Sequence, residues 1–114
     1  MNKEFIPYEQ ALALKELGFN EPCFGWFTDG HLRIGAVVEN KHVQGEGELL
    51  APTFSQAFRW FREKGYDVKV QKESANLYFG FYWTGAAWII VGNGTYKQAE
   101  LECLIKLIEI AKTK

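Results

Sequence analysis

The sequence predicts a single α+β domain spanning residues 1–114, in the element order helix, two strands, helix, three strands, helix. Three observations lead to this prediction: three segments have the chemistry of helix starts, the residues between them alternate with a period of two, and turn residues join the strand runs. Strands joined by tight turns pair antiparallel. We therefore expect a mainly antiparallel five-stranded sheet with the helices on one of its faces.

The three helix starts share one pattern, PYEQA at 7–11, TFSQA at 53–57 and TYKQA at 95–99. In the second and third, threonine can cap the helix while the glutamine three residues later bonds back to the backbone N–H of the cap. In the first, proline stands where a missing N–H costs nothing. Duplication of a helix-plus-hairpin unit could also explain the pattern, although capping chemistry alone suffices. The predicted helices span residues 8–17, 54–64 and 96–112.

Between the helices the polar and apolar residues alternate as in half-buried strands. Asp29 and Gly30 lie between two apolar runs and predict a hairpin turn, as does the sequence TGA at 84–86. The polar segment 39–48 is expected to be a mobile loop. The five predicted strands span residues 23–27, 32–38, 66–72, 77–83 and 88–92.

The composition is that of a small soluble protein with many aromatic rings. The chain has a formal net charge of −1 and 16% aromatic residues. A near-zero charge argues against a dedicated duplex-DNA binder, because such binding needs a summed positive field. Residues 1–57 are net acidic and residues 58–114 net basic, which could orient an anionic partner or be an accident of the surface. The longest apolar stretch, residues 86–91, is far shorter than the roughly 20 residues that span a bilayer.

The cysteines and histidines predict neither an enzyme nor a metal or cofactor site. Cys23 and Cys103 lack zinc-site and thioredoxin spacing, so we expect buried, reduced thiols in a cytoplasmic protein without a signal peptide or membrane association. His31 adjoins a tight turn and His42 lies in the polar loop, so we expect both to be exposed. Phosphate-loop, nucleophile-elbow and paired-histidine motifs are missing from the sequence.

The strongest anomaly is the aromatic run LYFGFYW at 77–83. Alternation along a strand assigns four of its residues to the core face: Leu77, Phe79, Phe81 and Trp83. The other face then carries Tyr78 and Tyr82 on either side of Gly80, which suits a partner subunit or a flat ligand that stacks on the rings. The alternative is an ordinary sheet surface covered by a terminal segment such as residues 5–6.

A second candidate site is Trp60, which lies between Arg59 and Arg62 on the second predicted helix. Rings beside cations are what a nucleotide or a single-stranded nucleic acid needs. The alternative is a tryptophan at the rim of the core with arginine stems lying over it.

The turn Asn93, Gly94 and Thr95 is a third candidate, because it joins a strand to a helix N-terminus that could bind an anion. It lacks the lysine and the full spacing of a phosphate loop. A tight strand-to-helix turn explains the glycines equally well.

Several segments, chiefly residues 50–64 and 99–109 and also 13–19 and 21–23, resemble small uncharacterised proteins encoded by temperate phages and mobile elements of gut anaerobic bacteria. The likeness covers the helices and is loose in the strands. It implies a small accessory protein that acts inside a bacterial host, and it assigns no functional residue.

The sequence therefore favours a non-catalytic protein-binding module, expected to be a homodimer and able to bind a host protein. Its binding surface would be the face of Tyr78 and Tyr82 or the broad apolar side of the last helix. The alternative is a binder of nucleotides or single-stranded nucleic acid, with a role in sequestration or interference.

Overall fold

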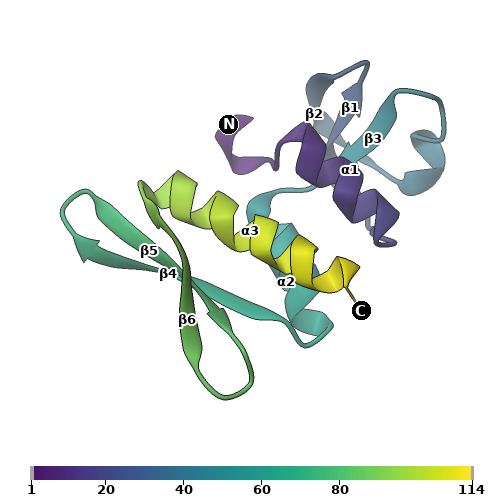
Figure 1. The fold of residues 1–114 in the computed structure, drawn as a ribbon. Helices are drawn as coiled ribbons and strands as arrows, with labels where there is room; N and C mark the ends of the chain where they lie inside the picture. The colour runs from purple at the N-terminus through teal and green to yellow at the C-terminus, as the bar shows by residue number, and fades with distance from the viewer. Residues whose placement is uncertain (1, 114) are drawn as a thin grey trace. The chain divides into compact units, whose positions relative to one another are not determined.

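The computed structural model describes residues 2–113, and its contacts divide the chain into two units with the boundary after Ala57 (Figure 1). Each unit combines helix with a three-stranded sheet, so the α+β class is confirmed. The elements are η1 (Asn2–Glu4), α1 (Tyr8–Glu16), β1 (Cys23–Thr28), β2 (His31–Val38), η2 (Asn40–His42), β3 (Glu48–Ala51), α2 (Phe54–Glu63), β4 (Asp67–Ser74), β5 (Leu77–Trp83), β6 (Trp88–Gly94) and α3 (Tyr96–Lys112).

The expectation of one five-stranded sheet is wrong. The described residues form two antiparallel sheets of three strands each, with strand orders β2-β1-β3 and β4-β5-β6. The missed strand is β3, which the sequence analysis did not separate from the polar loop before it. Its four residues are too few to set up an alternating pattern, and it is a strand because it pairs with β1 from Gly25 to Thr28.

In the first unit, β1 is the central strand and carries the core. Its hairpin with β2 turns at Asp29 and Gly30, as predicted from the sequence. Both residues have positive φ angles, 50° and 82°, as a type I′ turn requires. Alternate residues of β1, including Cys23 and Phe27, are buried. The ring of Tyr8 at the start of α1 meets Phe27 edge-on, with 5.3 Å between ring centroids. Helix α1 is therefore anchored to the buried face of β1.

In the second unit, β4, β5 and β6 form an antiparallel meander with α3 packed against it (Figure 1). Strand β6 has one extra residue, Val91, because Gly80 pairs with Gly92 while Phe81 pairs with Ile90. Helix α3 spans Tyr96–Lys112, the range predicted from the sequence. Its side that includes Leu104 and Leu107 is fully buried.

The predicted faces of β5 are reversed in the structure. A Cβ atom at Gly80 would lie 2.7 Å from the Sγ atom of Cys103 and 2.9 Å from the carbonyl oxygen of Ala99, so α3 packs directly on this glycine. The ring of Tyr78 meets Tyr96 of α3 edge-on at 5.5 Å. Tyr78, Gly80 and Tyr82 thus share the face that α3 covers. A helix backbone needs glycine to approach a sheet this closely, so the predicted core set of Leu77, Phe79, Phe81 and Trp83 is wrong.

This packing predicts that Gly80→Ala destabilises the protein by about 1 to 3 kcal/mol, because the added methyl group overlaps Cys103 and the backbone of Ala99. Urea denaturation measures the free energy of unfolding. The control is Asn93→Ala at an exposed position of β6, which we expect to change stability by less than about 0.5 kcal/mol. Equal stability of Gly80→Ala and the natural chain would mean that α3 does not lie on this glycine.

Candidate binding surface

The face of sheet β4–β5–β6 opposite α3 is lined by large apolar side chains. Directly paired residues of antiparallel strands lie on the same face, and Phe81 pairs with Lys69 and Ile90, while Trp83 pairs with Trp88. We call this surface the aromatic face and define it by six residues: Lys69, Phe79, Phe81, Trp83, Trp88 and Ile90.

The rings of the aromatic face contact one another in pairs. Phe79 and Phe81 lie edge-on with 6.3 Å between centroids, and Trp83 and Trp88 are tilted with 5.2 Å between centroids. The Nζ atom of Lys69 lies 4.6 Å from the ring centroid of Trp88 and 5.2 Å from that of Phe81. Each such cation–π contact at an exposed site stabilises by about 0.5 to 1 kcal/mol. The ammonium group therefore holds rings of two neighbouring strands together.

The aromatic face is accessible to solvent. Trp88 is 37% exposed and Ile90 is 58% exposed, while the phenylalanines and Trp83 are half-buried. An antiparallel sheet with one face on a helix usually presents polar side chains on the other face. This sheet is apolar on both, and a contiguous exposed apolar surface of this kind is typical of a binding site.

Polar side chains border the aromatic rings. Gln71 and Asn93 flank Phe79 from the two neighbouring strands, and Asp67 pairs with Trp83. The formal charges of Asp67 and Lys69 cancel. An apolar centre with a polar border and little net charge is the arrangement found in protein–protein interfaces.

Trp60 is not accessible for stacking with a nucleotide base, because its side chain is only 8% exposed. Its ring meets Phe61 edge-on at 5.0 Å, and the Nζ atom of Lys64 lies 4.6 Å from its centroid. Arg59 and Arg62 are exposed on the same helix. The alternative of a tryptophan at the rim of the core with a basic side chain over it therefore describes Trp60, and Lys64 lies over its ring.

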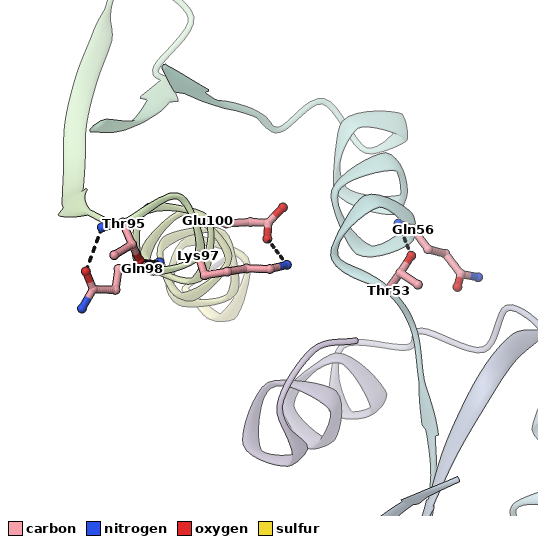
Figure 2. A network of polar contacts seen from close by, with 6 residues as sticks. All are labelled: Thr53, Gln56, Thr95, Lys97, Gln98 and Glu100. Atoms are coloured by element: carbon pink, nitrogen blue, oxygen red, sulfur yellow. Dashed lines mark hydrogen bonds and ion pairs between the residues drawn. The ribbon is translucent and has the colours of Figure 1, made fainter. Parts of the chain in front are cut away.

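The turn at Asn93, Gly94 and Thr95 leads into a complete capping box (Figure 2). The backbone N–H of Gln98 donates to the Thr95 hydroxyl at 3.2 Å, and the backbone N–H of Thr95 donates to Oε1 of Gln98 at 2.8 Å. Two of the amides that an anion would need are therefore already bonded within the protein. The second predicted box is half formed: Thr53 accepts from the N–H of Gln56 at 3.1 Å.

The side chain of Gln56 bonds elsewhere. Its Nε2 atom donates to the carbonyl oxygen of Pro22 at 2.8 Å, which ties the start of α2 to the segment before β1. Figure 2 also shows Lys97 of α3 donating to the largely buried Glu100 one turn later, at 2.8 Å. These hydrogen bonds hold the starts of α2 and α3. The positions of Thr53, Gln56, Thr95 and Gln98 are therefore explained by helix capping and need no bound ligand.

Both cysteines are buried free thiols, as the sequence predicts. Burial raises the pKa of Cys23 to about 12 and that of Cys103 to about 11. The Sγ atom of Cys103 donates weakly to the carbonyl oxygen of Lys69 at 3.7 Å. A thiol held protonated in this way is a poor nucleophile at neutral pH.

The two histidines are exposed, as expected, and they lie in separate segments. Nδ1 of His42 accepts from the backbone N–H of Glu39 at 3.2 Å and completes a cap of η2. Among residues 2–113, no group of three or more His, Cys, Asp and Glu residues could hold a metal ion. Within the same range, no helix is long and apolar enough to cross a membrane.

Comparison with known proteins adds no relative from which a role could be transferred. The chain matches no family model, no curated protein and no solved structure. The argument for function therefore rests on the geometry of the chain itself.

The raised thiol pKa values predict a loss of stability in alkali. The folded protein keeps both thiols protonated well above the ordinary value of 9.0, whereas the unfolded chain releases these protons near that value. The thiol contribution to stability is therefore fully present below pH 9 and is lost as the pH rises towards 11 and 12.

Urea denaturation between pH 8 and pH 10.5 measures this loss, with the double variant Cys23→Ala, Cys103→Ala as the control for other titrating groups. We expect the free energy of unfolding of the natural chain to fall more steeply with pH than that of the variant. Parallel pH profiles would contradict the burial of the thiols.

Proposed function

We propose that the protein is a non-catalytic protein-binding module that docks its partner on the aromatic face. One observation carries the proposal: sheet β4–β5–β6 is apolar on both faces, and α3 covers the glycine-containing one. The other exposes Trp88 and Ile90 next to half-buried rings. Removing such a surface from water is favourable by about 25 cal/mol of free energy per Å² of apolar area, and this burial contributes to the affinity for a partner.

The chemistry of the aromatic face favours a protein as the partner. Tryptophan and phenylalanine are enriched at the centres of protein interfaces, where rings contribute a large area at little cost in conformational entropy. Trp88 is the natural anchor, because it is the most exposed ring of the face and already contacts Trp83. The partner would present an apolar surface to the rings and polar groups to Gln71 and Asn93.

The second candidate is a nucleotide or single-stranded nucleic acid, bound on the same face in a sequestration or interference role. The position of Lys69 across two rings supports this alternative, because stacking and a cation are combined at one place. Base–aromatic stacking contributes about 1 to 3 kcal/mol per base. Tyr78, Tyr82, Arg59, Arg62 and the turn at Thr95 lie outside this face, and their part in binding stays a prediction.

The proposed setting is the cytoplasm of a bacterial host, in line with the resemblance to proteins of phages and mobile elements. Cys23 and Cys103 are both free thiols, which suits a reducing compartment. In that setting the partner would be a host protein.

A quantitative capture experiment tests this function. Three baits are used in a lysate of host bacteria: the natural chain, Trp88→Ser and Phe24→Ser. A protein that the natural chain captures is then purified, and its dissociation constant is measured for each bait. Phe24 is the matched control, because it is a 64% exposed aromatic residue on a strand of the other sheet. We expect Trp88→Ser to weaken binding by about 30-fold or more, while Phe24→Ser leaves it unchanged.

Equal affinity of Trp88→Ser and the natural chain would contradict docking on the aromatic face. Titration with nucleotides and short oligonucleotides separates the two candidates. Quenching of tryptophan fluorescence that weakens with added salt, and that Lys69→Ala abolishes, would select the nucleic-acid alternative over the protein partner.

A further inference from the structure

Strand β6 is an edge strand without the charged side chains that usually protect sheet edges. Within the described chain, β4 and β6 each pair only with β5, so both leave a row of backbone N–H and C=O groups free of strand partners. Natural proteins place charged residues on such edges to prevent pairing with another chain. The sequence of β4, DVKVQKES, has four charged residues, whereas that of β6, WIIVGNG, has none. One edge of the sheet is therefore protected and the other is open to a further strand.

A groove runs along this open edge. It lies between β6 and α3 and has a volume of about 330 Å³. Ile89 and Ile105 supply exposed apolar surface in it, with 42% and 37% of their side chains accessible. The groove is lined by Ile89, Ile90, Val91, Glu102, Ile105, Lys106 and Glu109. Its lining includes apolar side chains against which those of an added strand can pack.

We propose that the chain forms a homodimer in which β6 pairs antiparallel with β6 of a second copy. This goes beyond the proposed binding function, since it concerns the backbone edge of β6, the strand that also carries Trp88 and Ile90 of the aromatic face. The pairing joins the two sheets of β4, β5 and β6 into one continuous six-stranded sheet. It is isologous, because each copy offers the same strand, and it therefore closes at two subunits.

We expect the strand that pairs with the edge of β6 to come from a second copy of the chain. The first reason is that β6 itself is a suitable strand for this edge. It is apolar over its first four residues and uncharged throughout, and its bulge lies at its centre, at Val91. Pairing it with its own copy buries no charge, whereas a strand such as β4 would bring charged side chains to the seam. The middle residue of β6 is Val91, so antiparallel pairing over the full strand places the two-fold axis near this residue.

The charges on α3 are complementary about the same axis. A Cβ atom at Gly94 would touch the side chain of Gln98, and one at Gly92 would touch that of Glu102, so two residues of β6 correspond to four of α3. Val91 is therefore level with Leu104. Glu102 and Lys106 lie two residues on either side of that level and have opposite charges.

A two-fold axis near Val91 consequently brings Glu102 towards Lys106 of the partner subunit, and Lys106 towards the partner's Glu102. In the described residues of the single chain, Lys106 forms an ion pair with the exposed Glu109 at 3.4 Å. It can therefore turn to a new partner at little cost. The dimer also has a consequence for the other surface: Trp88 and Ile90 lie next to the seam, so the two aromatic faces become continuous.

Multi-angle light scattering and sedimentation equilibrium over the micromolar range test the proposal. We expect the natural chain to reach twice its monomer mass of 13.1 kDa. Ile90→Lys places a charge on the open edge and should raise the dimer dissociation constant by about 100-fold or more. The matched control is Val37→Lys, because Val37 is also 58% exposed and lies on β2, an edge strand of the other sheet.

A monomer at high micromolar concentration would overturn the proposal. So would a dimer that Ile90→Lys leaves intact, or one that Val37→Lys dissociates. Circular dichroism of each variant checks that the fold is retained, and the exposure of both positions makes this the expected result.

Charge exchange tests the seam without altering β6. Glu102→Lys and Lys106→Glu each place like charges across the axis, and each should weaken the dimer by about 5- to 10-fold. The double variant restores opposite charges and should return to within about 2-fold of the natural chain. Additive weakening in the double variant would contradict the antiparallel arrangement, even if a dimer forms.

Discussion

The close packing of α3 on Gly80 is the contact on which the second unit depends. The helix backbone occupies the space that a side chain at this position would need. A Cβ atom at Gly80 would lie 2.9 Å from the carbonyl oxygen of Ala99 and 2.7 Å from the Sγ atom of Cys103. Gly92 gives α3 similar access to the neighbouring strand. Because the helix occupies the glycine face, the rings of Phe79, Phe81 and Trp83 lie on the other side of the sheet. The aromatic face follows from the position of these two glycines.

The same constraint brings the exposed rings into contact with one another. Rings on an open sheet face are shielded from water by contacts with one another and with long side chains. The ammonium group of Lys69 lies over two of these rings, those of Phe81 and Trp88. Trp83 and Trp88 close the end of the face at the β5–β6 hairpin. A surface held in one arrangement before binding loses less conformational entropy when a partner docks.

The local structure was largely predictable from the sequence, and the assignment of sheet faces was not. The predicted helix starts are confirmed, because capping depends on a few adjacent residues, as the complete capping box at Thr95 illustrates. The hairpin at Asp29 was correct for the same reason. Strand β3 and the division into two sheets depend on pairing between distant segments, which no local pattern reveals. Period-two alternation defines two faces of β5 but does not say which one a helix covers. The signal that could have decided it was the register of Gly80 opposite Gly92, since paired glycines open a path for a helix.

Nuclear Overhauser effects in the isotopically labelled protein measure where α3 lies on the sheet. We expect cross-peaks between the Hα protons of Gly80 and the Hβ protons of Cys103, and between the ring protons of Tyr78 and Tyr96. Cross-peaks from Cys103 to the rings of Phe79 or Phe81, with none to Gly80, would place the helix on the aromatic face and contradict the account.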